Sequence, residues 1–191
     1  MEKPSQLSAG ARKYLLKLAR TSLEHIFKTG KHFLVRKGEV PKVLSLKGAS
    51  FVTLTKNGEL RGCIGRLEAA RALYLDVIEN TYAAAFDDYR FPQLLESELP
   101  QIKIEISVLT KPQPLPYKTA ADLPGLLIKY RPGVILQSGF NSATFLPQVW
   151  EQLPDACEFL HELCLKAGLQ GEAWREGELL IFTYQVENFQ E

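Results

Sequence analysis

The segment from residue 50 to residue 65, SFVTLTKNGELRGCIG, limits the possible folds of this chain more than any other stretch. It consists of two β-prone runs separated by Asn57 and Gly58. An Asn-Gly pair between two such runs is the strongest short-range signal for a β-hairpin. The segment therefore predicts an antiparallel strand pair with a two-residue turn.

The turn also predicts which residues face each other. With a two-residue loop, counting outward places Leu54 opposite Arg61 and Val52 opposite Cys63. Because side chains alternate between the two faces of a sheet, Arg61 and Cys63 are expected on the same face.

The remaining chain alternates helical and strand patterns without regular βαβ spacing. A helix of about twenty residues is predicted after Ser8, which would cap it, and is expected to end at Gly30. Further elements follow: a surface loop (31–48), a helix (68–86), a strand (102–110), a proline-rich extended connector (111–116), a short helix (119–130), a second hairpin (134–137 and 143–146), a helical piece (148–150), a helix capped by Asp155 and ended by Gly168 (156–169), and one long final strand (178–189). This order predicts an α+β fold, an antiparallel or mixed sheet with packed helices.

Composition narrows the class of protein. A chain of 191 residues with 46% hydrophobic residues is long enough for one domain with a full core, and we expect residues 1–191 to form it. The formal net charge of +1 gives no electrostatic case for wrapping duplex DNA. No window resembles a signal peptide or a membrane span, which predicts a soluble cytoplasmic protein.

Three cysteines, an odd number, fit reduced thiols better than a disulfide framework. Cys157, His161 and Cys164 are spaced to share a helix face, and three such ligands are enough for a zinc ion with an open position. The pattern favours instead an amphipathic helix whose inward stripe is Cys157, Leu160, Cys164 and Leu165. We therefore predict no metal and no cofactor.

Cys63 is the first candidate for chemistry. A thiolate is a nucleophile, and a cation such as Arg61 on the same face would lower the pKa of the thiol. Gly62 and Gly65 would let a ligand or another backbone approach closely, and they suit a bulge or kink at the end of the strand. The alternative is a buried, inert cysteine facing apolar partners on the neighbouring strand, and the residues alone favour it.

Asp88 and Arg90 are the second candidate, together with Asp87. An acid pair at a helix end suits acid/base work, and Arg90 would bind a carboxylate or phosphate through two parallel hydrogen bonds. Phe91 offers a ring on which a base could stack. The alternative is a salt-bridged turn in which Arg90 pairs with an aspartate, and it is favoured.

Five segments in order, LRGCIG, AAFDDYRFP, IKIEISVL, GVILQSGFNSATFLPQVW and EFLHELCLKAGL, resemble the family called AmmeMemoRadiSam system protein A, which has an AMMECR-type domain. The resemblance covers roughly residues 15–186. Its hexapeptide corresponds to residues 60–65, its turn motif to Asp88, Arg90, Phe91 and Pro92, and its third motif to residues 146–150. The sequence departs from the family at Gln93, where a second proline is frequent.

The resemblance implies a two-lobed α+β protein, with a larger and a smaller lobe and the hexapeptide lining a cleft between them. It also implies the company of a MEMO-like protein and a radical S-adenosylmethionine (SAM) enzyme. No particular reaction comes with it. In such a cleft, a reactive Cys63 stands as an equal alternative to a structural one.

Two functions follow from these features. The first is an enzyme or enzyme subunit in which Cys63 and Asp88 are catalytic, while Arg61, Gly62, Gly65, Arg90 and Phe91 bind a small or anionic substrate. The second is a non-catalytic module that binds a ligand and presents it to the partner proteins. Binding of a nucleic acid or nucleotide ranks below both, because the chain is nearly neutral.

Overall fold

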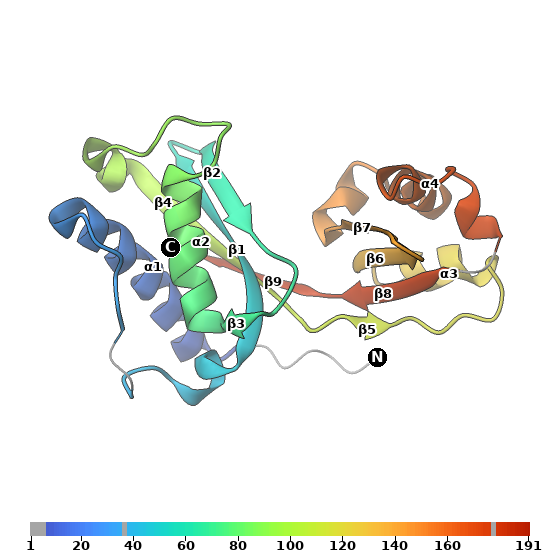
Figure 1. The fold of residues 1–191 in the computed structure, drawn as a ribbon, viewed down its shortest axis with the longest axis horizontal. Helices are drawn as coiled ribbons and strands as arrows, with labels where there is room; N and C mark the ends of the chain where they lie inside the picture. The colour runs from blue at the N-terminus through green and yellow to red at the C-terminus, as the bar shows by residue number, and fades with distance from the viewer. Residues whose placement is uncertain (1–6, 36–37, 177–178) are drawn as a thin grey trace. The chain divides into compact units, whose positions relative to one another are not determined.

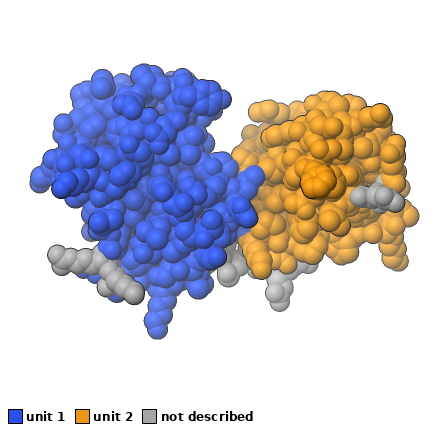
Figure 2. Space-filling view, in the orientation of Figure 1, with its two compact units in different colours: residues 1–110, 187–191 blue, residues 111–186 orange. Residues whose placement is uncertain are grey.

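A computed structural model describes residues 7–35, 38–176 and 179–191. The chain divides into two compact units, residues 1–110 with 187–191 and residues 111–186 (Figure 2). Each unit contains its own antiparallel sheet, its own helices and its own hydrophobic core. The predicted α+β class is confirmed. No helix among the described residues is long and apolar enough to cross a membrane.

The first unit opens with helix α1 (Ala9–Thr29), whose ends were predicted correctly. The Ser8 side chain accepts a hydrogen bond from the Ala11 backbone, and Gly30 adopts the left-handed conformation with φ 67°. The predicted loop that follows contains a short 3₁₀ helix (Lys42–Ser45), and Arg36 and Lys37 lie outside the described residues.

The sheet of the first unit has the strand order β2-β1-β4-β9, and β3 also pairs with β1. Its strands are β1 (Lys47–Lys56), β2 (Glu59–Gly65), β3 (Arg71–Ala72), β4 (Ile102–Leu109) and β9 (Val186–Gln190). Helices α1 and α2 (Leu73–Phe86) pack against each other and against this sheet (Figure 1). The alternate residues Val52, Leu54, Ile104 and Ile106 are fully buried in the resulting core.

The second unit has a four-stranded sheet in the order β5-β8-β6-β7. Its elements are β5 (Gln113–Pro114), α3 (Asp122–Ile128), β6 (Gly133–Ser138), β7 (Asn141–Phe145), a 3₁₀ helix (Pro147–Glu151), α4 (Ala156–Lys166), a 3₁₀ helix (Ala173–Arg175) and β8 (Leu180–Tyr184). Trp150 stacks on Phe159 with ring centroids 3.8 Å apart in its core. The predicted cap at Asp155 is confirmed, because its carboxylate accepts bonds from the Cys157 and Glu158 backbones.

Several predicted elements differ from the structure. The final run is two strands, since β8 belongs to the sheet of the second unit and β9 to that of the first; Glu178 lies outside the described residues. Helix α2 begins at Leu73 because Arg71 and Ala72 pair with β1 as strand β3. The second hairpin has a two-residue turn, since Ser138 pairs with Asn141, and its register differs by one residue from the prediction, with Val134 opposite Phe145 and not Leu146.

The buried stripe of α4 was also partly wrong. Leu160 and Cys164 are fully buried as predicted, but Cys157 is half-buried and Leu165 is 48% exposed. The inward face is instead completed by Phe159 and Leu163. No group of three metal-ligating side chains occurs among the described residues.

Candidate functional site

The hexapeptide lies on strand β2, and its pairing with β1 contains a β-bulge. Lys56 pairs with Glu59 and Thr55 with Leu60 as the turn requires, and Asn57 and Gly58 both have positive φ angles. The register then shifts by one residue, so that Leu54 pairs with Gly62, and Arg61 has no pairing residue opposite it on β1. An extra residue of this kind is typical of a bulge.

The bulge corrects the predicted neighbours of the thiol. Cys63 pairs with Thr53, not with Val52. Thr53 alternates with the buried residues Val52 and Leu54, so its side chain lies on the sheet face that carries no helix. Cys63 is therefore on this helix-free face, half-buried, and the Thr53 hydroxyl donates a hydrogen bond to its Sγ over 3.3 Å.

The turn motif holds the backbone of Cys63. The Cys63 N–H donates to Asp88 Oδ2 over 2.8 Å, and Arg90 Nη2 donates to the Cys63 carbonyl over 3.2 Å. Strand β2 is at the end of the strand order, so these two groups would otherwise form an unpaired sheet edge. The Asp88–Arg90 pair thus binds the edge of β2 at one residue as a further strand would, and its bonds go to the backbone of Cys63, not to the thiol. We call this arrangement the edge clamp.

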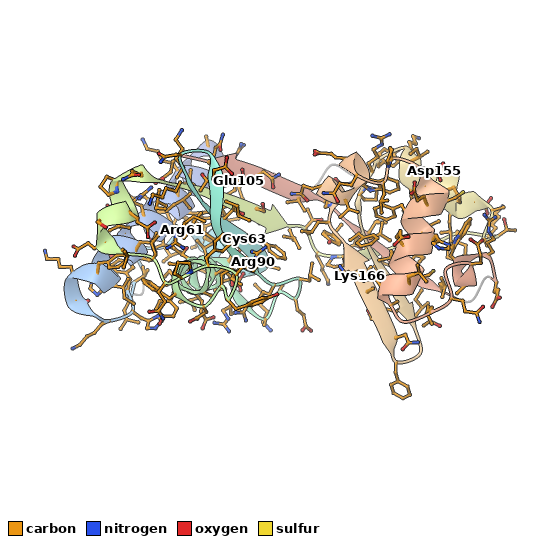
Figure 3. The ribbon with its side chains drawn as sticks, turned by 90° about the horizontal axis from the view of Figure 1, so that it is seen from above. Arg61, Cys63, Arg90, Glu105, Asp155 and Lys166 are labelled. Carbon is orange, nitrogen blue, oxygen red and sulfur yellow. The ribbon has the colours of Figure 1, made fainter. Side chains whose placement is uncertain are left out.

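The two charged members of the edge clamp, Asp88 and Arg90, are bound to each other, and Arg90 lies close to Cys63 (Figure 3). Arg90 Nε and Nη2 donate to the two carboxylate oxygens of Asp88 over 2.9 and 2.7 Å, and the Arg90 backbone N–H donates as well. Bonding from Arg90, with that from Cys63, holds the pKa of Asp88 well below its usual range although Asp88 is only 4% exposed. The same pairing raises the pKa of Arg90.

These contacts bear on the predicted role of Asp88. A carboxylate with a strongly lowered pKa that accepts four hydrogen bonds is poorly suited to exchange protons near neutral pH. The geometry is that of the predicted salt-bridged turn, with two additional hydrogen bonds to the backbone of Cys63 on strand β2. Phe91 adds to it, because the Arg90 guanidinium lies 5.5 Å from the centre of its ring.

Arg61 is committed to a second charged pair. Its Nε and Nη2 donate to the two carboxylate oxygens of Glu98 over 3.1 and 2.9 Å, and its guanidinium also donates to the carbonyls of Pro92 and Gln93. Bonding from Arg61, with that from Lys56, lowers the pKa of Glu98 to about 2. The prediction that Arg61 is available to act on the thiol is therefore not supported by its contacts.

The two glycines of the hexapeptide are explained by packing. A Cβ on Gly62 would lie 2.0 Å from the Ala84 carbonyl oxygen of α2, which shows that helix backbone occupies this space. A Cβ on Gly65 would lie 2.3 Å from the Phe51 ring. The glycines were predicted to make room for a ligand or for another backbone. Gly62 makes room for the backbone of α2, and Gly65 makes room for the Phe51 side chain.

Three contributors to the site were missed at the sequence level: Thr53, Glu98 and Glu105. Glu105 pairs with Thr53 from the opposite side, so Cys63, Thr53 and Glu105 form one row across strands β2, β1 and β4 on the helix-free face. Its alternation with Ile104 and Ile106 predicts that Glu105 faces outward, but it does not predict that Glu105 lies in the row of the thiol. The row follows only once the bulge is known.

Comparisons with known proteins agree with the resemblance. A family model described as AMMECR1 matches residues 16–189. A protein of Methanothermobacter thermautotrophicus is 36% identical over 190 residues, which cover 99% of this chain and 98% of the relative. A protein of Thermofilum pendens is 36% identical over 197 residues, covering 97% and 92%. The crystal structure of an uncharacterized protein from Pyrococcus horikoshii is similar with a TM-score of 0.79 and 32% identity, covering 95% of this chain and 92% of that one.

Proposed function

The chain belongs to the AMMECR1 family, and we propose that it acts as an enzyme or enzyme subunit whose reactive group is Cys63. One observation carries the proposal: the edge clamp binds both backbone groups of Cys63 while the thiol stays half-buried on the helix-free face. A backbone that is held at both its N–H and its carbonyl positions the side chain it carries for reaction.

The immediate surroundings of the thiol support this role. The Thr53 hydroxyl lies 3.3 Å from Sγ and stabilises a thiolate more than a thiol, because a negatively charged acceptor binds a donor more strongly. In the proposed step the thiolate attacks an electrophilic carbon of a small substrate. A sulfur–carbon bond forms as the bond from that carbon to its leaving group breaks, and the proton of the thiol is lost to solvent beforehand.

In this proposal Asp88 and Arg90 are positioning residues. They reach the reaction only through the backbone of Cys63, and their mutual ion pair leaves neither of them to exchange protons. The AmmeMemoRadiSam resemblance supports a further part of the proposal, that the protein works with a MEMO-like protein and a radical SAM enzyme. The interlobe cleft that the resemblance implies stays a prediction.

The test is the pH dependence of alkylation by iodoacetamide, read by mass spectrometry for each cysteine. The chain supplies two internal controls, since Cys157 is half-buried like Cys63 while Cys164 is fully buried and its burial raises the pKa of its thiol. We expect Cys63 to react at least tenfold faster than Cys157 at pH 7. Protection of Cys63 until the protein unfolds would sink the proposal.

A ligand-binding module without turnover is the second candidate, and one observation favours it. Around Cys63 the charged groups Asp88, Arg90, Arg61 and Glu98 are all paired with one another, so that a proton donor or acceptor adjusted to neutral pH is not among them. Co-purification with the two partner proteins separates the candidates. A complex that persists in Cys63→Ser and supports full function in a complementation assay would favour the module.

A further inference from the structure

In the row that contains Cys63 the charged side chain is Glu105, while the exposed Lys103 lies outside this row, two residues along β4 on the same face. Arg61 and Arg90 point their guanidinium groups at protein acceptors, as described above. Glu105 is half-buried and has no ion-pair or hydrogen-bond partner for its side chain within the described part of the chain. In the row that contains Cys63, the unneutralised charge is therefore negative.

The row places Glu105 close to the thiol. Thr53 pairs directly with Cys63 on one side and with Glu105 on the other. Directly opposed side chains in an antiparallel sheet have Cβ atoms about 5 Å apart. Two such steps place the carboxylate within about 10 Å of Sγ, close enough to act on a charged ligand across the row before salt screens it.

We propose that Glu105 selects cationic ligands for Cys63, an inference that rests on the proposed role of that thiol. The ligand class is a small molecule with an electrophilic centre for the thiol and, one or two strand spacings away, an ammonium or guanidinium group for Glu105. This replaces the anionic substrate predicted from the presence of Arg61 and Arg90 in the two motifs. The replacement follows because both arginines are already neutralised by carboxylates of the protein.

Two thiol reagents of matched size and opposite charge test the selection. One is a trimethylammonium-ethyl methanethiosulfonate and the other is a sulfonatoethyl methanethiosulfonate. With either, the thiolate attacks the sulfenyl sulfur, a mixed disulfide forms and methanesulfinate leaves. The measured quantity is the ratio of the two rate constants at Cys63, divided by the same ratio for 2-mercaptoethanol under the same conditions.

We expect the normalised ratio to exceed one by about three- to tenfold at low salt, the size of a Coulomb interaction over this distance at a protein surface. Glu105→Gln should bring the ratio to about one. Glu24→Gln is the matched control, because Glu24 is an exposed carboxylate on α1, the other side of the sheet. It removes the same charge and should leave the ratio as in the wild type.

The possible failures are distinguishable. Equal ratios in the wild type and in Glu105→Gln, with Cys63 reactive in both, overturn the selection by Glu105 and leave the reactive thiol intact. Resistance of Cys63 to both reagents while Cys157 is modified overturns the reactive thiol and the selection together. A thermal unfolding curve of Glu105→Gln that matches the wild type confirms that the ratio reports the site and not a loss of folding.

Discussion

Two buried carboxylates in the first unit behave in opposite ways. Asp88 in the edge clamp is 4% exposed and has a lowered pKa, whereas Asp76 on α2 is fully buried and has a raised pKa. Asp76 also accepts bonds, from the Ser50 backbone and hydroxyl and from Asn80. Burial alone therefore does not decide the pKa of a carboxylate in this protein.

The difference lies in the depth of burial, which desolvates Asp76 more than Asp88, and in how the neighbouring arginine is placed. Arg90 meets Asp88 with two aligned hydrogen bonds. Arg66 lies 3.1 Å from Asp76 Oδ1, but neither atom forms a hydrogen bond, so the ion pair is close without being aligned. Desolvation is then the largest influence on the pKa of Asp76 and is only partly offset by its neutral donors.

The largest effect is expected from Asp88→Asn. The substitution leaves Arg90 without its carboxylate and turns an amide N–H toward a guanidinium, so we expect the free energy of unfolding to fall by about 2–3 kcal/mol. Chemical denaturation at pH 7 measures the loss. A loss below about 0.5 kcal/mol would show that the edge clamp is a solvent-screened surface pair. Tyr89→Ala is the control, since Tyr89 lies in the same turn and is 95% exposed.

The acid dependence of stability should change in opposite directions in two variants. Because the pKa of Asp88 is lowered on folding, its contribution is present above about pH 4 and is lost as the pH falls further. Because the pKa of Asp76 is raised on folding, the folded state binds its proton more tightly than the unfolded state. Its contribution to the free energy of unfolding therefore grows as the pH falls from that raised value toward about 4. Between pH 7 and pH 3, Asp88→Asn should therefore lose less stability than the wild type, and Asp76→Asn should lose more.

Urea denaturation at several pH values measures how the free energy of unfolding of each variant changes with pH. Glu98 is expected to contribute in the same direction as Asp88, because its pKa is lowered to about 2. If both variants lost less stability than the wild type between pH 7 and pH 3, or both lost more, the contrast between the two carboxylates would be contradicted.

The smallest effect is expected from Asp76→Asn at neutral pH. The amide oxygen can still accept from Ser50, and the cost of a desolvated charge disappears, so we expect a change of about 1 kcal/mol or less in the free energy of unfolding. The measurement is the same denaturation experiment at pH 7. A loss as large as that of Asp88→Asn would mean that Arg66 stabilises Asp76 despite the poor alignment.

Much of the fold could be predicted because its signals are local. The Asn-Gly turn, the caps at Ser8 and Asp155 and the alternation of residues 102–109 each depend on neighbours only a few positions apart. The register beyond the turn could not be predicted, because Gly62 and Gly65 suit a bulge but do not indicate at which residue it occurs. That one-residue shift moved the partner of Cys63 from Val52 to Thr53.

The site depends mainly on contacts between distant positions. Cys63 and Asp88 are 25 residues apart, and Arg61 and Glu98 are 37 apart. The sequence shows that the two motifs contain charged residues, but a charge pattern does not state which carboxylate each guanidinium binds. The anionic substrate was predicted from Arg61 and Arg90, whose guanidinium groups are paired with Glu98 and Asp88 in the structure, and the substrate class stays a prediction.

By itself, the sequence determined the α+β class, the first hairpin and the ends of α1, because propensity, capping and side-chain periodicity act over a few residues. Tertiary structure alone decided that residues 180–190 serve two sheets, that Asp88 and Arg90 close the edge of β2, and that Cys63 shares a row with Thr53 and Glu105. The physical reason is that strand pairing and ion pairing are chosen by competition among distant partners, which is settled only when the chain packs.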